Sequence, residues 1–274
     1  MRARRYWIGG ISIIVSGLVF VVPFIFIVLT AVKDKQAASL LQFSWPSQWQ
    51  VLENLKEVIA EQNYMLLTAY INSTIITVVA VVLLVVCAAM AGFVLQRRKT
   101  AATGFIDFVV LFGLIMPPSV VPTIWVLQEL HLFKTLTGMI LIETAYGLPF
   151  SVLLFRAFVS TIPRELDEAA IIDGAGPLGV FFRVVLPLLR PVIVTVVVVQ
   201  SVTIFNDFTN PLYYMPGDQN ATVQVTLYNF QSLYDTSYNL LCMNILLITI
   251  PPLIMFLFFN RQIVAGMTSG AVKG

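Results

Sequence analysis

Long apolar stretches alternate with shorter polar segments along the chain, and this alternation is the strongest feature of the sequence. A helix needs about 20 predominantly apolar residues to cross the hydrocarbon core of a bilayer. Six stretches are near or above that length. We therefore expect an all-α polytopic membrane protein, forming a single membrane domain over residues 1–274, whose six transmembrane helices cover residues 7–32, 65–95, 104–127, 137–159, 191–207 and 239–260.

The first stretch follows three arginines and lacks a small-residue cleavage site before the charged residues at 33–35. It is therefore predicted to be a retained span rather than a signal peptide. The polar segment 33–64 is predicted to be a loop with one short amphipathic helix. Prolines and a glycine are predicted to interrupt three spans, which suits bent helices around a conduit. These residues are Pro117, Pro118, Pro122, Gly147, Pro149, Pro251 and Pro252.

Composition supports membrane insertion, since 58% of the 274 residues are hydrophobic, only 11% are charged, and the mean hydropathy is +0.90. A soluble domain carries about a quarter charged residues. Cys87 and Cys242 lie in apolar stretches and are predicted to be small buried hydrophobes. His131, the only histidine, has no neighbours suited to metal binding or catalysis. We therefore expect no metal site and no catalytic residues.

The distribution of basic residues predicts the orientation of the spans. If the N-terminus is cytoplasmic, the N-terminal arm, residues 97–99, residues 156–190 and the C-terminal tail hold 12 of the 16 Lys and Arg. The remaining four, Lys33, Lys35, Lys56 and Lys134, then lie outside. Because cytoplasmic loops are enriched in Lys and Arg, both termini and residues 163–187 are predicted to be cytoplasmic.

Residues 163–187 form a polar island between two apolar stretches, and we call this segment the ledge. Proline and acidic residues suit the first turn of a helix, and here they are Pro163, Glu165, Asp167 and Glu168. Leu166, Ala169 and Ala170 then recur at helical spacing and predict a narrow face that another surface can approach closely. Gly174 and Gly176 predict a turn, and a second helix from about Leu178 to Leu186 is expected to end before Pro187. The pattern indicates a helix–turn–helix built to contact a partner.

The ledge also carries a spaced motif. Glu168-Ala169-Ala170 is followed after three residues by Gly174, and after nine more by Val184-x-Leu186-Pro187. This resembles the EAA loop of ABC-importer permeases, with Val184 where isoleucine is common. In that family the loop forms coupling helices that sit in a cleft of a cytoplasmic ATPase. The resemblance implies ATPase coupling by Glu168, Ala169, Ala170, Asp173, Gly174, Leu186 and Pro187.

Further stretches resemble the sugar-importing branch, specifically the second permease subunit of maltose-type systems. They are FSWPSQW…ENLKEVI, IPRELDEAAIIDGAG, Phe205-Asn206-Asp207-Phe208 and the ending from Gly266 to Gly274, with Phe205 where the family commonly has tryptophan. The resemblance implies that Gly266, Gly270 and Lys273 contact the ATPase, and that the outer loop at about 209–238 reaches a solute-binding protein.

The same resemblance implies the partners. A second, different permease subunit would complete the translocation path, and two ATPase subunits would use ATP and Mg. An extracytoplasmic solute-binding protein would deliver the sugar. The chain itself has no P-loop, so we expect no enzyme activity and no cofactor in this subunit. The expected setting is the lipid of a bacterial inner (plasma) membrane, with no nucleic-acid partner.

Several polar residues fall within the predicted spans. Glu143, Gln200 and Asn206 suit the lining of a polar solute path or a gate, because ionisable and polar groups at depth usually face a bundle interior or water. Hydrogen bonds between helices are the alternative explanation. Asp107 and Asp207 lie near span ends, where interfacial placement is expected.

The sequence therefore predicts a permease subunit that forms half of the path for a sugar, an oligosaccharide or disaccharide, in a binding-protein-dependent ABC importer. An importer of glycerol-phosphate or another polyol shares the same pattern and stays open as an alternative. A stand-alone secondary transporter is a further alternative, although only Glu143 is a convincingly buried carboxylate and no duplicated halves are evident.

Overall fold

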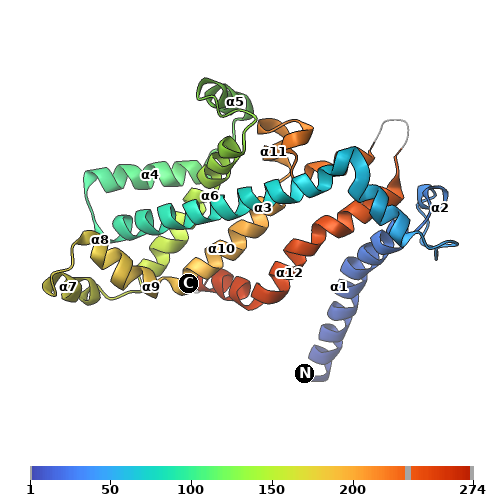
Figure 1. Ribbon diagram of the computed structural model, residues 1–274. Coiled ribbons are helices and arrows are strands. Elements are labelled where there is room, and N and C mark those ends of the chain that lie inside the picture. The colour runs from blue at the N-terminus through green and yellow to red at the C-terminus, as the bar shows by residue number, and fades with distance from the viewer. Residues whose placement is uncertain (1, 232–235, 272–274) are drawn as a thin grey trace. The chain divides into compact units, whose positions relative to one another are not determined.

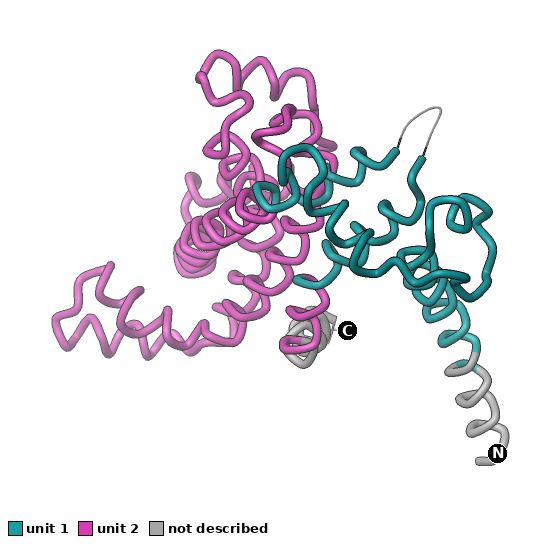
Figure 2. Tube along the Cα trace, turned by 45° about the vertical axis from the view of Figure 1, so that its right-hand side comes forward, with its two compact units in different colours: residues 1–69, 223–251 teal, residues 70–222, 252–274 magenta. Residues whose placement is uncertain are grey.

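The computed structural model describes the backbone of residues 2–231 and 236–271, and the side chains of residues 12, 15–231 and 236–259. Every regular element in these residues is helical, which confirms the all-α class. By its internal contacts the chain divides into two compact units (Figure 2). Unit 1 comprises residues 1–69 and 223–251, and unit 2 comprises residues 70–222 and 252–274.

Unit 1 is built from the first and last parts of the chain. It holds α1 (Arg2–Ala31), α2 (Lys35–Ser39), the start of α3 (Val51–Arg97), η3 (Val225–Phe230) and the start of α12 (Tyr238–Ala271). The buried Asn54 amide donates to the carbonyls of Ala31 and Lys33, at 2.9 Å each, just after α1 ends. Asn239 in turn donates to Asn54 Oδ1 at 3.0 Å. Because helix ends leave carbonyls unpaired, these amides satisfy groups that would be costly to bury.

Lys33 is buried rather than solvated in unit 1. Its ammonium donates to the carbonyl of Gln42 at 2.8 Å and to Ser44 Oγ at 3.1 Å. A cation after the last turn of α1 also complements the negative end of the helix dipole. Lys33 therefore fastens the loop 42–44 to the end of α1, a role that counting charges in the sequence does not reveal.

Unit 2 is organised around α6 (Leu136–Val159), which packs against α4 (Ala101–Ile115), α10 (Arg190–Phe205) and α11 (Thr209–Tyr214). The elements α5 (Val120–Glu129) and η2 (Asp218–Asn220) complete its outer part. The ledge elements α7, α8 and α9 lie at one end of α6, and α5 and α11 lie at the other end (Figure 1). The core beside the ledge includes Leu84, Phe155, Val159, Val185 and Val196, and these side chains come from α3, α6, the ledge and α10.

Within the described residues, three helices are long and apolar enough to cross a membrane. They are α3, α6 and the Tyr238–Phe259 part of α12. A fourth candidate is a bent pair, Pro177–Leu188 with Arg190–Phe205, whose two parts meet at 75°. Val15–Ala31 and α4 are shorter apolar helices. The structure thus supports three or four spans by length and composition, against the six that the sequence predicted.

The helix breaks differ from those expected from proline and glycine. The stretch 104–127 is not one continuous helix, because α4 ends at Ile115 and α5 begins at Val120, with Pro117 and Pro118 between them. In contrast, α6 continues through Pro149, and α12 continues through Pro251 and Pro252. A single missing N–H removes one hydrogen bond and bends a helix without ending it when its neighbours hold it. Met116, the residue before Pro117, has extended backbone with ψ 126°, and α4 stops there, whereas the same pair of adjacent prolines at 251–252 leaves α12 continuous.

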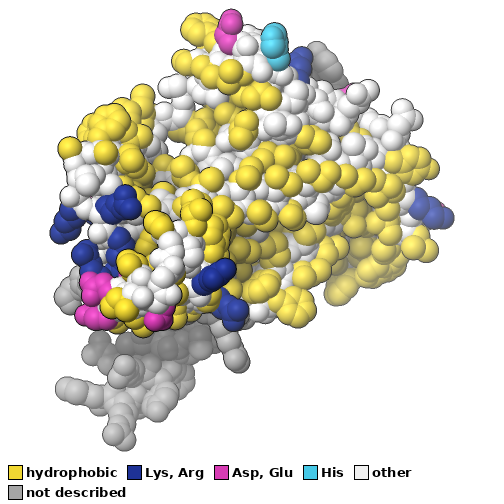
Figure 3. All heavy atoms as spheres, turned by 60° about the vertical axis from the view of Figure 1, so that its left-hand side comes forward, with side chains coloured by type: hydrophobic (Ala, Val, Ile, Leu, Met, Phe, Trp, Pro, Cys, Tyr) yellow, Lys and Arg dark blue, Asp and Glu magenta, His cyan; other side chains and the backbone are white. Residues whose placement is uncertain are grey.

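Helix α3 contains a break that coincides with the predicted start of the second span. Residues Glu61 to Tyr64 have non-helical backbone angles, and φ is positive at Gln62, Asn63 and Tyr64. The part before the break corresponds to the short amphipathic helix expected within 33–64. The part after it carries exposed apolar side chains such as Val78, Val82 and Val86, which suit contact with lipid. In the space-filling view charged side chains gather in small groups, separated by a largely apolar surface (Figure 3).

Candidate functional site

The first helix of the ledge is α7 (Glu165–Ile172), which has Glu165, Asp167 and Glu168 in its first turn. Glu168 is exposed, whereas Asp167 turns inward to pair with Arg97 Nε at 2.6 Å. Arg97 also donates to the carbonyl of Ile162 at 3.0 Å. Both side chains of the pair are mostly buried, so the attraction is weakly screened by solvent. The pair fixes the start of the ledge to the end of α3, and the sequence analysis did not foresee it.

The turn after α7 depends on Gly174. Its φ is +85°, in the region where a side chain is strained, and nothing lies within 4 Å of the position that a Cβ would take. Backbone conformation therefore accounts for glycine here, as the sequence predicted, and steric crowding does not. Asp173 precedes the turn as an exposed C-cap whose N–H donates to the carbonyl of Ala169. Gly176 has φ −70° and needs no special freedom.

The second half of the ledge is helical from Pro177 to Leu188, as α8 (Pro177–Gly179), the π-helix η1 (Val180–Val185) and α9 (Leu186–Leu188). The sequence predicted that this helix ends before Pro187, and that boundary is wrong. Pro187 lies within α9, directly after the π-helix, and the helical segment continues beyond it to Leu188. The chain bends by 75° only between Leu188 and Arg190. Leu186 is half-buried and Pro187 is exposed.

The ledge has an inward face of four buried side chains, Ala170, Val180, Phe181 and Val185. They belong to the same core as Phe155 of α6. The Phe181 ring lies against the Phe93 ring of α3, with centroids 5.6 Å apart. Ala170 is only 9% exposed, so it packs against the helices of this chain. The close-approach face predicted from Leu166, Ala169 and Ala170 is therefore divided, with Leu166 and Ala169 exposed and Ala170 inside.

Around the Gly174 turn the ledge carries an apolar tip, which we define as Ile171, Ile172 and Leu178. These side chains are 60%, 84% and 65% exposed. They flank the Gly174 turn, and Glu168 lies one helical turn before Ile172. Exposed apolar groups rimmed by polar residues mark contact surfaces more often than chance placement. The tip was not predicted from the sequence, although two adjacent isoleucines in a polar island are a usable signal.

The three polar residues proposed from the sequence to line a solute path, Glu143, Gln200 and Asn206, lie in three different environments. Gln200 is buried, and its Nε2 donates to Ser151 Oγ at 3.2 Å and to the carbonyl of Gly147 at 3.4 Å. A Cβ on Gly147 would come within 2.3 Å of Leu84 and 3.0 Å of Gln200, so this glycine permits close helix packing. Gln200 therefore joins α10 to α6. Asn206 is exposed and donates to the carbonyl of Val202 in its own helix at 2.9 Å.

Glu143 lies in a polar group at the other end of α6 from the ledge. It is buried and interacts with the side chains of Asp207 and Asn210. Asp207 Oδ1 also accepts the backbone N–H of Asn210 at 3.2 Å. Nearby, the hydroxyls of Tyr146 and Tyr214 are 3.0 Å apart. Burial, followed by this hydroxyl contact, raises the pKa of Tyr214 to about 12. The group connects α6 to the start and end of α11.

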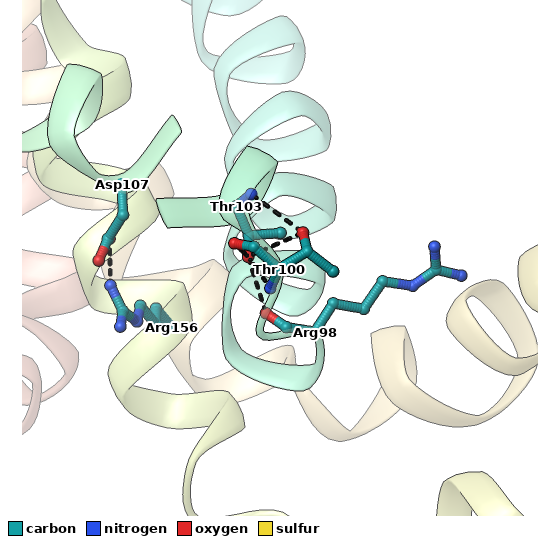
Figure 4. Close-up of polar contacts among 5 residues, drawn as sticks. All are labelled: Arg98, Thr100, Thr103, Asp107 and Arg156. Carbon is teal, nitrogen blue, oxygen red and sulfur yellow. Dashed lines mark hydrogen bonds and ion pairs between the residues drawn. The ribbon is translucent and has the colours of Figure 1, made fainter. Parts of the chain in front are cut away.

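Asp107 also has a specific partner. It forms an ion pair with Arg156, which joins α4 to α6 (Figure 4). Beside it, Thr100 and Thr103 form a capping box that starts α4. The sequence predicted that Asp107 lies at the membrane interface, and its half-buried position is compatible with that. Its partner Arg156, 49 residues away in the chain, was not predicted. Figure 4 shows Arg98 extending away from the Thr100–Thr103 pair.

The remaining predicted residues are only partly described. Gly266 and Gly270 belong to the last part of α12, and Lys273 lies outside the described residues. The outer loop 209–238 is described except for residues 232–235. Cys242 is buried as expected, but Cys87 is exposed on α3, so the prediction for Cys87 is wrong. The apolar surface of a membrane helix explains why its apolar context did not imply burial.

Comparison with known proteins gives consistent matches over most of the chain. The family described as "Binding-protein-dependent transport system inner membrane component" matches residues 84–267, which include the ledge. The melibiose/raffinose/stachyose import permease protein MelC of Bacillus subtilis (strain 168) is 31% identical over 280 residues, covering 100% of both chains. The diacetylchitobiose uptake system permease protein NgcG of Streptomyces coelicolor is 29% identical, covering 95% of this chain and 87% of the relative.

Among solved structures, the fold is similar to a chain of a bacterial ABC transporter involved in the import of the acidic polysaccharide alginate. The TM-score is 0.82 at 17% identity, and the match covers 95% of this chain and 98% of that chain. A second structure, of a bacterial alginate ABC transporter in complex with an alginate pentasaccharide-bound periplasmic protein, matches with a TM-score of 0.68 at 15% identity. At this level of identity the likeness concerns the fold alone.

Proposed function

Because the chain belongs to the family of inner membrane components of binding-protein-dependent transport systems, we propose that it is the permease subunit of an ABC importer for an oligosaccharide or disaccharide. It forms half of the translocation path, and a second, different permease subunit forms the other half. The named relatives MelC and NgcG import oligosaccharides, which supports this substrate class over glycerol-phosphate or another polyol. Family membership also argues against a stand-alone secondary transporter.

The observation that carries the proposal is the two-sided construction of the ledge. Its tip exposes three large apolar side chains, while its inward face is packed into the core that includes Phe155 of α6. A partner that binds the tip therefore gains contact with an element that is rigidly attached to the helices of this chain. The partner we propose is a separate ATPase, and Glu168 orients it from the exposed side of α7.

Coupling follows from how the ledge is connected. The ledge begins shortly after α6 ends at Val159 and continues to α10, which begins at Arg190. When ATP with Mg closes the ATPase dimer, the ledge moves with the ATPase surface and α6 and α10 tilt together. The Gln200 contacts to Ser151 and Gly147 keep these two helices in register. The path then opens outward to receive sugar, and hydrolysis returns it to the inward-open state.

The proposed placement has six spans, with both termini and the ledge in the cytoplasm. The 12-to-4 division of basic residues supports this orientation. Glu143 and Asn206, near the end of α6 and of α10 that is remote from the ledge, are the proposed polar contacts of the path. The outer loop 209–238 meets an extracytoplasmic solute-binding protein, and Gly266, Gly270 and Lys273 meet the ATPase.

The decisive experiment isolates the complex through a tag on this chain and identifies its components. The complex is then reconstituted with its solute-binding protein, and ATP hydrolysis is measured against a panel of oligosaccharides, glycerol-phosphate and polyols. We expect an ATPase in the isolate and stimulation by an oligosaccharide. Stimulation of ATP hydrolysis by glycerol-phosphate alone would mean that the importer carries glycerol-phosphate or another polyol. Transport by the chain in liposomes without an ATPase would overturn the importer proposal.

A further inference from the structure

A cavity of about 500 Å³ opens between the end of α3 and the ledge, entirely within unit 2. Its size falls in the range of about 300–1,000 Å³ that is typical of small-ligand sites. The lining is predominantly apolar. From α3 it includes Met90, Phe93 and Val94, and from the ledge it includes Ile171, Ala175 and Leu178. Such a lining offers few partners for a sugar or another hydroxyl-rich solute.

The charged part of the lining is confined to Arg97, Arg98 and Asp167. Arg97 and Asp167 form the ion pair that ties α7 to α3, so their charges compensate one another. Arg98 adds a positive charge, and the exposed Lys99 follows it directly in the chain. Figure 4 shows the Arg98 side chain extended away from the Thr100–Thr103 pair. The cavity thus combines an apolar interior with excess positive charge at its edge.

The cavity also lies where α3 changes from apolar to basic residues. Val94 is the last exposed apolar residue of α3, and Arg97-Arg98-Lys99 follow within one turn. In a membrane helix this transition marks the boundary between hydrocarbon and the headgroup layer on the cytoplasmic side. A ligand at this depth meets hydrocarbon at one end and water at the other, as a phospholipid does.

We propose that this cavity binds one anionic phospholipid of the cytoplasmic leaflet, with an acyl chain against Phe93, Val94 and Ala175 and the phosphate at Arg98. Charge complementarity selects an anionic headgroup, because each Lys or Arg near the surface attracts anionic lipid. The proposal rests on the cytoplasmic placement of the ledge given under the proposed function. The bound lipid bridges α3 and the ledge, so it stabilises the orientation of the tip.

The test measures lipid retained by the intact complex, extracted into nanodiscs through a tag on this chain and released for native mass spectrometry. The probes are phosphatidylglycerol and phosphatidylcholine of matched acyl chains, supplied in equal amounts. We expect one phosphatidylglycerol to remain bound, in preference to phosphatidylcholine. Equal retention of the two lipids would overturn the charge argument and with it the proposal.

Two pairs of variants locate the lipid. Val94→Phe fills the cavity and is expected to remove the retained phosphatidylglycerol, whereas Val82→Phe, on an exposed part of α3 outside the cavity, is expected to leave it unchanged. Arg98→Gln is expected to lower phosphatidylglycerol retention about fivefold, since one basic residue near the surface contributes that order of attraction. Arg190→Gln removes an exposed charge outside the cavity and serves as its control.

A photo-crosslinker at Val94 separates the lipid from other occupants. Capture of phosphatidylglycerol supports the proposal, and capture of the second permease or the ATPase at this position overturns it. The measurement does not depend on ATP hydrolysis or on the transported solute. The two proposals therefore fail in different measurements. The importer proposal fails if the isolated complex contains no ATPase. The lipid proposal fails if phosphatidylglycerol is not retained preferentially or if Val94→Phe does not reduce its retention.

Discussion

The two sides of the ledge differ in what surrounds them, although they share a segment of only 25 residues. The inward face, Ala170, Val180, Phe181 and Val185, is packed into the core of unit 2, whereas Ile171, Ile172 and Leu178 of the tip stand largely in the open. Adjacent residues such as Ala170 and Ile171 therefore have opposite roles. The ledge is therefore both a packed part of unit 2 and an exposed apolar surface that suits contact with another protein.

The largest effect is expected on the inward face. Phe181→Ala removes a buried ring that contacts Phe93, and it should lower the free energy of unfolding by about 3–5 kcal/mol. Thermal unfolding followed by size-exclusion fluorescence measures the loss. Phe182→Ala, which truncates the exposed neighbouring ring, is the matched control and should have a much smaller effect. Equal loss in both variants would mean that the two sides are not energetically distinct.

A substitution in the tip should weaken binding of the ATPase and leave the stability of the fold almost unchanged. Ile172→Asp leaves the buried packing untouched, so the free energy of unfolding should change by no more than about 0.5 kcal/mol. Association with the ATPase should weaken by about 2 kcal/mol, or roughly thirtyfold, because a buried isoleucine contact is lost. Co-purification of the ATPase and substrate-stimulated ATP hydrolysis measure this. Ile172 does not line the cavity beside α3, so lipid retention should not change. If Ile172→Asp still shows full substrate-stimulated ATP hydrolysis, the tip is not part of the proposed interface with the ATPase.

An intermediate effect is expected where the ledge is tied to α3. Asp167→Asn leaves Arg97 mostly buried without its counter-ion and should destabilise the ledge by about 2 kcal/mol. Hydrogen exchange of α7 should accelerate, and coupling should fall as the tip loses its fixed orientation. Glu165→Gln, which neutralises an exposed carboxylate in the same first turn, provides the control. Unchanged exchange in α7 would contradict the anchoring role of the pair.

The smallest effect is expected at the turn, where substitutions of its two glycines should differ in their effect on stability. Gly174→Ala forces a side chain into a backbone with φ +85° and should destabilise the turn by about 1–2 kcal/mol. Gly176→Ala is compatible with its φ of −70° and should have almost no effect. Transport rate and the unfolding midpoint of the two variants measure the difference. Equivalent behaviour would show that conformational freedom at position 174 is not needed.

Some of this architecture follows directly from the sequence, and the reasons are local. Gly174 and the acidic first turn of α7 are signals within a few residues, and the expected helix–turn–helix is present in the described structure. The second ledge helix was predicted too short, because Pro187 was treated as a stop although the helical segment continues to Leu188. A proline indicates that a helix starts or ends nearby, but its neighbours decide which.

Other features were not accessible because they depend on residues far apart in the chain. Asp107 and Arg156 are 49 residues apart and the Arg97 contact to Ile162 spans 65 residues, so no local pattern pairs them. The side of α7 that faces inward also depends on where α3 and α6 lie. Helical spacing placed Ala170 with Leu166 and Ala169, but the position of the core decides that Ala170 is buried.

The asparagine pair of unit 1 has a consequence for how the protein is made. Asn239 follows Asn54 by 185 residues, so the amide oxygen of Asn54 gains this donor only late in translation. At ordinary synthesis rates of about 5–20 residues per second, the interval is roughly 10 to 40 seconds. During that interval Asn54 Oδ1, next to the end of α1, lacks the Asn239 donor, which arrives only when the start of α12 has been synthesised.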